Sequence, residues 1–135
     1  MKYVVLVGRI LFSIPFIMGI VGHFSEQDIA YASAAGVPLA SVAVPLSGII
    51  AFLGGLSIVL GYKAKWGAWL IVLFLLPVTL MMHKFWGVPD QMAAQMQMIM
   101  FIKNFSLLGT ALMISYLGTG PLSLDSWLEK KAITK

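Results

Sequence analysis

Four long stretches of the chain are almost entirely hydrophobic, and polar residues collect between them. They are residues 3–22, 41–60, 66–83 and 98–117. Arg9 interrupts the first stretch, and Lys103 and Asn104 interrupt the fourth. A helix needs about 20 apolar residues to cross the hydrocarbon core of a bilayer, so the pattern predicts four transmembrane helices. They use nearly the whole chain, and we therefore expect one transmembrane domain over residues 1–135.

The composition agrees with a membrane protein. Hydrophobic residues make up 60% of the 135 residues and charged residues only 10%, whereas a soluble domain has about 25% charged residues. The mean hydropathy is +0.95. The first stretch is also longer than the apolar part of a secretory signal peptide, about 7–15 residues, so we expect it to be retained. The expected fold is an all-α, integral membrane four-helix bundle.

The distribution of lysines predicts the orientation. The N-terminus, the second connection and the C-terminus lie on one side of a four-span protein, and they carry Lys2, Lys63, Lys65, Lys130, Lys131 and Lys135. On the other side Lys84 is accompanied by Glu26, Asp28 and Asp90. The positive-inside rule therefore places both termini in the cytoplasm. The net charge of +4 indicates contact with acidic membrane lipids and not with nucleic acid, because no basic groove interleaved with aromatic residues is present.

Two segments outside the spans predict surface helices. Ser25, with Asp28 three positions later, is typical of a helix N-terminus. We expect a short helix from there to about Gly36 in the first outer loop, with the second spanning helix beginning at Pro38 or Pro45. At the C-terminus the amphipathic sequence SWLEKKAITK is expected to lie on the inner membrane surface.

Small residues in the second span predict close helix packing. Ala51 and Gly55 are four positions apart, a spacing that lets a neighbouring helix approach closely. The neighbour can belong to the same chain or to a second copy, so the pattern also permits a homo-oligomer.

Polar residues near the outer ends of the spans form the first candidate site. Lys103 and Asn104 lie about two turns into the fourth helix, and His83 and His23 end the third and first helices at the same level. Trp86 follows His83 in the outer connection. Charges inside a membrane are costly and indicate function. We therefore predict ligand binding by Lys103, Asn104, His83, Trp86 and His23.

Arg9 is a separate intramembrane charge near the inner end of the first helix. Its long side chain can extend to the inner interface and leave its charged group in water. The alternative is a functional buried charge. The spans contain no acidic residue that could pair with it.

Several short sequences across the chain resemble the DoxX family of small four-helix bacterial inner-membrane proteins. They are Gly8-Arg9-Ile10-Leu11, AAGVP at 34–38, FLGGLSIVLGY at 52–62, His83-Lys84-Phe85-Trp86 and Phe101-Ile102-Lys103-Asn104. The resemblance implies a multi-pass bundle in the bacterial inner membrane. It also implies redox work, because named members are linked to thiosulfate oxidation coupled to quinone and to oxidoreductase complexes with soluble partners. Many relatives carry a glutamate where this chain has Ala51, which leaves Arg9 without that partner.

Two functions are favoured over others. In the first, the protein is a subunit of a redox-linked complex and binds a quinone or similar ligand: Lys103 and His83 hydrogen-bond a carbonyl, His83 transfers a proton, and Trp86 stacks on the ring. In the second, it is a non-catalytic scaffold that docks a partner protein. The chain has no cysteine and so no thiolate or iron–sulfur chemistry of its own. Whether it is an enzyme stays open.

Two metal hypotheses are weaker. Copper could be bound by Met92, Met96, Met98 and His83, since thioether and imidazole groups suit Cu(I). However, methionine also occurs freely at apolar positions elsewhere in this chain. Haem could be bound by His23 and His83, but both histidines are expected at the membrane surface, which suits haem poorly.

Overall fold

The computed structural model describes residues 2–133, and the regular elements in that range are all helices. They are α1 (Lys2–Met18), the 3-10 helix η1 (Gly19–Phe24), α2 (Glu26–Ala34), α3 (Ala40–Leu60), α4 (Ala64–Met82), α5 (Gln91–Leu117) and α6 (Leu124–Ile133). The continuous helix α1–η1 and the helices α3, α4 and α5 are each long and apolar enough to cross a membrane. The predicted all-α fold with four spanning helices is therefore confirmed.

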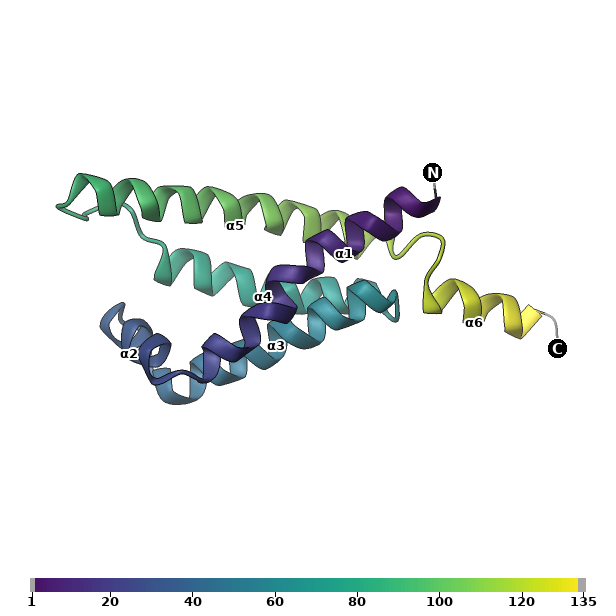
Figure 1. Cartoon of the computed structure of the whole chain (residues 1–135), viewed down its shortest axis with the longest axis horizontal. Helices are drawn as coiled ribbons and strands as arrows, with labels where there is room; N and C mark the ends of the chain where they lie inside the picture. Colours follow the sequence, from purple (N-terminus) through teal and green to yellow (C-terminus); the bar gives the residue numbers. More distant parts are fainter. Residues whose placement is uncertain (1, 134–135) are drawn as a thin grey trace.

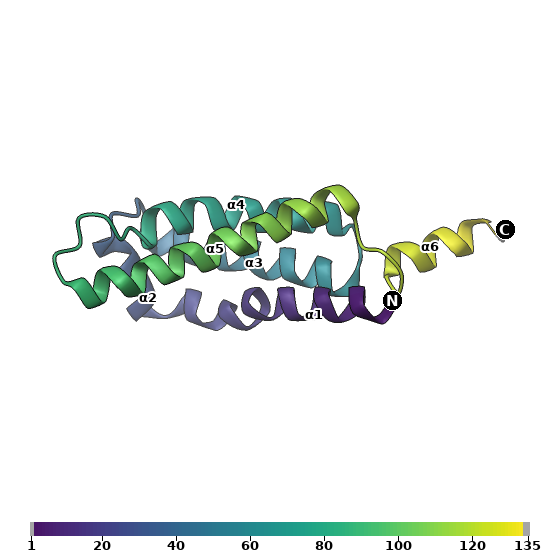
Figure 2. The same ribbon diagram turned by 90° about the horizontal axis from the view of Figure 1, so that it is seen from above.

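The four long helices run along one common axis (Figures 1 and 2). α3 packs against α1 and α4, and α4 packs in turn against α5. One end of the bundle carries the N-terminus, the α3–α4 turn and α6, and we call it the termini end (Figure 1). The opposite end carries η1, α2 and the α4–α5 connection, and we call it the distal end. The termini end corresponds to the predicted cytoplasmic side.

Glycines let α3 approach both of its neighbours closely. A Cβ atom added at Gly54 would lie 2.8 Å from the carbonyl oxygen of Gly67 on α4. On the α1 side, a Cβ atom at Gly55 would lie 3.1 Å from the Cβ of Phe16. Ala51 on the same helix is 2% exposed. The small-residue pair of the second span therefore serves helix packing within the chain.

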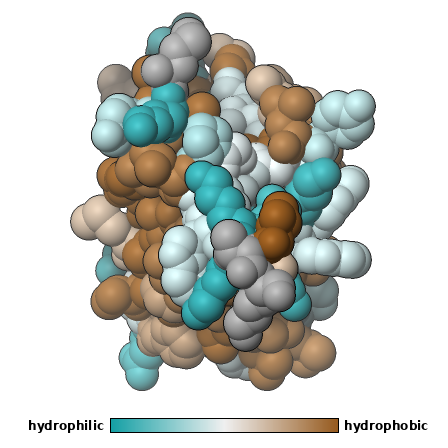
Figure 3. All heavy atoms as spheres, turned by 90° about the vertical axis from the view of Figure 1, so that its right-hand side faces the viewer, coloured by the Kyte–Doolittle hydropathy of each residue, from teal (hydrophilic) through white to brown (hydrophobic). Residues whose placement is uncertain are grey.

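The buried core lies where these helices meet, whereas the outward faces remain apolar. Its largest members are Phe12, Phe16, Ile58, Ile71 and Leu75. Large hydrophobic side chains such as Leu73 and Met113 are more than half exposed. In Figure 3, which looks onto the termini end, hydrophilic residues gather near the middle and hydrophobic residues cover much of the sides. This distribution suits a bundle whose sides contact lipid.

The predicted helix in the first connection is present as α2. Ser25 is its N-cap, and its Oγ accepts a hydrogen bond of 3.1 Å from the Asp28 backbone N–H. The helix ends at Ala34, because Gly36 adopts the left-handed conformation with φ +87°. α3 begins at Ala40, close to the first of the two predicted starts, and Pro45 lies inside its early turns.

One helix boundary differs from the predictions. α5 begins at Gln91, seven residues before the predicted span, because the Asp90 carboxylate caps it by accepting a 2.7 Å hydrogen bond from the Ala93 N–H. The sequence from Asp90 to Asn104 is therefore helical almost throughout. α6 extends away from the termini end in both ribbon views and does not lie across it (Figures 1 and 2).

Candidate functional site

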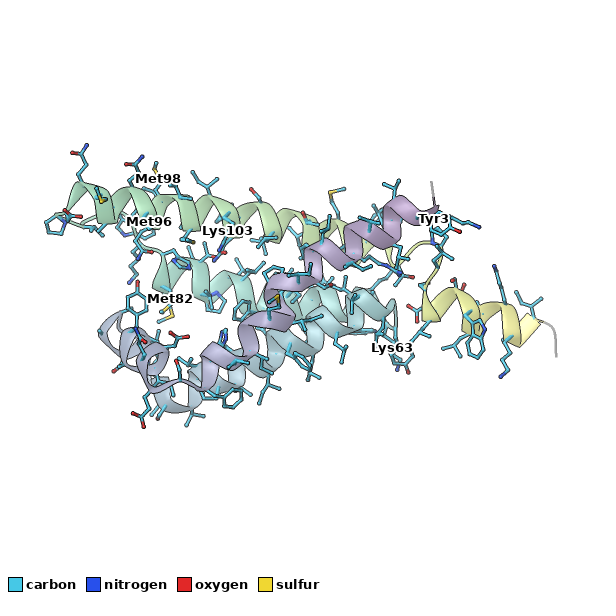
Figure 4. All side chains as sticks on the ribbon, in the orientation of Figure 1. Tyr3, Lys63, Met82, Met96, Met98 and Lys103 are labelled. Carbon is cyan, nitrogen blue, oxygen red and sulfur yellow. The ribbon has the colours of Figure 1, made fainter. Side chains whose placement is uncertain are left out.

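A cavity of about 340 Å³ lies at the distal end, between α2, α3 and α4. Its apolar walls come from Ala32, Val37, Pro38, Ala43, Val44, Pro77, Val78, Met81 and Met82. Its polar lining residues are His23, Asp28, Tyr31 and Ser47. Figure 4 shows Met82 at the distal end of α4, on the side of α2. Ligand pockets have volumes of about 300–1,000 Å³ and combine apolar walls with a few polar groups. The cavity therefore has the size and lining of a small-molecule site.

His23 brings an oriented imidazole to this cavity. Its Nδ1 is 2.8 Å from the carbonyl oxygen of Gly19. A carbonyl oxygen can only accept, so Nδ1 carries the hydrogen of this bond. The ring also packs on Phe74, with 5.7 Å between the ring centroids. In its neutral form His23 consequently keeps the lone pair of Nε2 for another donor.

Tyr31 is held by a chain of hydrogen bonds that joins three helices. The side-chain amide of Gln97 on α5 donates to the Tyr31 hydroxyl oxygen at 2.9 Å. The amide oxygen of Gln97 lies 2.9 Å from Nδ1 of His83, which must be the donor. The Tyr31 oxygen accepts in this chain, and its own hydrogen has no acceptor among residues 2–133. Tyr31 is 50% exposed, so this hydrogen is open to water or to a ligand.

The predicted ligand pair Lys103 and Asn104 lies elsewhere on α5, and neither residue lines the cavity. Lys103 is exposed, and its Nζ lies 3.4 Å from the sulfur of Met100 (Figure 4). Asn104 is only 5% exposed. Successive residues of an α-helix point about 100° apart. The two neighbours in sequence therefore face different surroundings.

Trp86 also lies outside the cavity. Its side chain is half exposed and packs edge-on against Phe85 and Phe101, with ring centroids 5.2 and 5.9 Å apart. His83 does not line the cavity either; it hydrogen-bonds Gln97, which in turn donates to Tyr31. Of the five predicted ligand residues, the structure places His23 in the cavity wall and His83 two hydrogen bonds away from Tyr31.

The methionines of the copper hypothesis are spread apart, and each histidine of the haem hypothesis is oriented by a hydrogen bond at Nδ1 that leaves Nε2 free. Met92 and Met96 are more than half exposed, and Met96 and Met98 project from opposite sides of α5 (Figure 4). His83 and His23, the proposed haem ligands, each use Nδ1 in the hydrogen bonds described above. Within residues 2–133 no group of three or more His, Cys, Asp or Glu side chains is placed to hold a metal ion.

Arg9 extends to the termini end, as the first alternative expected, but its charged group is buried there and does not reach water. Its side chain is 4% exposed. Its two terminal nitrogens donate to the backbone carbonyl oxygens of Thr119 at 3.2 Å and Leu122 at 2.5 Å. Both acceptors belong to the connection between α5 and α6. Arg9 therefore fixes this connection to α1 and has a structural role.

The absence of a glutamate at Ala51 does not leave Arg9 without partners. The Arg9 guanidinium lies against Gly61, whose φ of +67° ends α3. Ala51 is ten residues earlier on that helix, about 15 Å along its axis at 1.5 Å per residue. Backbone carbonyls, and not a side chain at position 51, accept from the two terminal nitrogens of Arg9, whereas Nε has no hydrogen-bond partner.

The sequence alone predicted neither a role for Tyr31 nor its hydrogen bond to Gln97. A signal was present for Tyr31, since tyrosines are enriched at membrane interfaces and α2 was expected there. No local pattern links Tyr31 to Gln97, because the two residues are 66 positions apart and belong to different helices.

Comparison with known proteins agrees with the family resemblance found in the sequence. The sequence profile of the DoxX family matches residues 4–84. The inner membrane protein YqjF of Escherichia coli (strain K12) is 33% identical over 131 residues, which cover 94% of this chain and 93% of that protein. The inner membrane protein YphA of the same strain is 28% identical over 116 residues, covering 86% and 79%. No solved structure matches. The residues that line the distal cavity all fall within the segment matched by the family profile.

Proposed function

The chain belongs to the DoxX family of multi-pass inner-membrane proteins, and from this premise we propose that it binds a small apolar ligand with a carbonyl group in the distal cavity. A quinone head group is the ligand that best fits this description, with the protein as a subunit of a redox-linked complex. The observation that supports the proposal is the Tyr31 hydroxyl, whose oxygen is occupied by Gln97 and whose hydrogen is not used within residues 2–133.

The walls of the cavity suit such a ligand. Met81 and Met82 provide an adaptable apolar surface, and Pro77 provides a rigid one. Tyr31 is 50% exposed, so its hydroxyl hydrogen can be donated to water or to a ligand. A ligand carbonyl that replaces water there gains a hydrogen bond of about 0.5–1.5 kcal/mol. Ligands of the same size without an acceptor gain none.

His23 complements Tyr31 in the same cavity. A quinone, when bound, supplies two-electron and two-proton chemistry. Tyr31 donates to a carbonyl oxygen, and the free Nε2 of His23 accepts from a hydroxyl group. One cavity therefore offers contacts for the oxidised and for the reduced form of such a ligand. His83 and Gln97 are positioning residues, because they hold the Tyr31 oxygen.

Titration of the detergent-purified protein with a ubiquinone carrying one isoprenoid unit, followed by calorimetry, tests this proposal. Tyr31→Phe keeps the ring and removes only the hydroxyl, so the Kd is expected to rise about tenfold, the equivalent of one hydrogen bond. Tyr116→Phe is the matched control, because Tyr116 is 81% exposed near the other end of α5, and it should bind normally. Wild-type protein that binds no quinone, or Tyr31→Phe that binds as tightly as wild type, contradicts the proposal.

A second candidate is a scaffold that docks a partner protein, and α6 favours it. Trp127 and Ile133 are 57% and 85% exposed on a helix that extends away from the bundle (Figure 1). Deletion of residues 127–135 should then abolish recovery of the native complex and leave quinone binding intact. Tyr31→Phe should give the opposite pattern if the first candidate is correct.

A further inference from the structure

A second hollow lies at the termini end and is independent of the distal cavity. It is an open groove of about 830 Å³ between the α3–α4 turn on one side and α6 with the α5–α6 connection on the other. The side chains that matter for its chemistry are Lys63, Lys65, Trp66, Asp125, Leu128 and Glu129. Figure 3 looks onto this end and shows the hydrophilic residues gathered there.

The two walls of the groove carry opposite charges. Lys63 caps the start of α4 and Lys65 lies in its first turn, whereas Asp125 and Glu129 belong to α6. Asp125 is partly used, because its Oδ1 accepts a 3.0 Å hydrogen bond from the backbone N–H of Lys63. Within the described part of the chain, Lys65 and Glu129 form no ion pair, although both line the groove. The groove thus separates a cation from an anion and leaves both for a ligand.

Hydrogen bonds and close contacts fix the two walls relative to each other. The Asp125 N–H donates to the Gly61 carbonyl oxygen at 2.9 Å, and Arg9 holds the preceding residues. The stem of Lys65 lies against Gly118, where an added Cβ would be 3.3 Å from Cε. Because these contacts involve backbone and buried groups, the opposed charges sit on a fixed frame.

The groove lies at the level of a membrane interface. α3 ends at Leu60, α4 begins at Ala64 and α5 ends at Leu117, so three spanning helices terminate around it. Trp66 on its wall is 73% exposed, as is typical of the aromatic residues found at lipid head groups. Leu128 adds apolar surface beside the charged groups. The position and mixed lining suit an amphipathic molecule from the bilayer itself.

We propose that this groove binds the head group of a zwitterionic phospholipid with a primary ammonium group, that is, a phosphatidylethanolamine. The lysine wall contacts the phosphate, and Glu129 accepts hydrogen bonds from the ammonium group. A phosphatidylcholine carries the same charges but its quaternary ammonium has no N–H to donate. In an anionic phosphatidylglycerol the phosphate satisfies the lysines, but a neutral glycerol takes the place of the ammonium group and gives Glu129 no cation to pair with.

Native mass spectrometry of the full-length protein in detergent tests the proposal with equal amounts of these three lipids. Wild-type protein is expected to retain phosphatidylethanolamine about two- to fivefold more than phosphatidylcholine, the range of one exposed charge pair. Glu129→Gln should abolish this preference, whereas Lys65→Gln should lower retention of all three phospholipids. Glu26→Gln at the distal end is the control and should change nothing.

Three results would overturn the assignment. Phosphatidylglycerol retained above phosphatidylethanolamine indicates a basic site for anionic lipid only. Equal retention in wild type and Glu129→Gln shows that the ammonium group is not recognised. Soluble glycerophosphoethanolamine that displaces the lipid at equal concentration shows that the groove binds the free head group and not a membrane lipid.

Discussion

Replacing Arg9 by methionine is expected to destabilise the protein and to release the connection between α5 and α6. Methionine keeps an unbranched apolar side chain in α1 and removes only the guanidinium. The lost contacts are the two hydrogen bonds to the carbonyl oxygens of Thr119 and Leu122. The perturbation is therefore local to the termini end and leaves the distal cavity unchanged.

The size of the effect follows from two opposing contributions. A hydrogen bond from a charged group contributes about 1.5–3 kcal/mol, and Arg9 makes two. Against them stands the cost of burying the guanidinium, whose Nε has no hydrogen-bond partner and which costs about 1–3 kcal/mol. The midpoints of the two contributions, about 4.5 and about 2 kcal/mol, leave a net loss of about 2–3 kcal/mol of unfolding free energy. For a chain of this length it lowers Tm by roughly 6–12 °C.

Two measurements check this expectation. Thermal unfolding in detergent gives the change in Tm, and hydrogen exchange with mass spectrometry gives the protection of the amides between Gly118 and Ser123. Arg9→Lys should fall between wild type and Arg9→Met, because one ammonium cannot reproduce the planar fork of the guanidinium. Lys2→Met, an exposed change on the same helix, should leave both readouts unchanged. Unaltered exchange in Arg9→Met would refute the proposed structural role.

Three further changes test the packing and the site. Gly54→Ala places a Cβ 2.8 Å from a backbone oxygen of α4 and should lower Tm, whereas Gly109→Ala meets nothing within 4 Å and should be neutral or stabilising by calorimetry. Asp90→Ala removes the N-cap of α5, and circular dichroism melting should show a loss of about 1 kcal/mol. Gln97→Leu frees the Tyr31 oxygen to turn away; quinone titration should show weaker binding with an unchanged Tm.

The spanning helices could be predicted because each depends on residues that are close together in the sequence. Runs of about 20 apolar residues define them, and Ser25 marks the start of α2 through a hydrogen bond to a residue only three positions away. The start of α5 was placed seven residues too far along the chain, because the prediction followed the apolar run alone. The methionines and glutamines before residue 98 reduce the apolar signal, although Asp90 caps a helix that begins there.

The distal cavity could not be predicted because it depends on which helices become neighbours. Lys103 and Asn104 are adjacent in sequence, but an α-helix turns them toward different surroundings. The Tyr31 hydroxyl is held by a hydrogen bond from Gln97, which lies on another helix 66 positions later. Arg9 was judged by the lack of an acidic side chain, whereas its acceptors are backbone carbonyls more than 100 positions away. Side-chain type gives no information about such acceptors.

The positions of the polar groups also decide on which side a ligand in the distal cavity exchanges protons. The core between the two ends is formed by Phe12, Ile58 and Leu75, and Ser13 within it is fully buried without a hydrogen-bond partner. Proton transfer through a protein needs a continuous chain of donors and acceptors. Under the proposed function, Tyr31 and His23 therefore exchange protons at the distal end, where Tyr31 is 50% exposed. The positive-inside rule predicts that this end faces away from the cytoplasm, so proton uptake on reduction should follow the external and not the cytoplasmic pH.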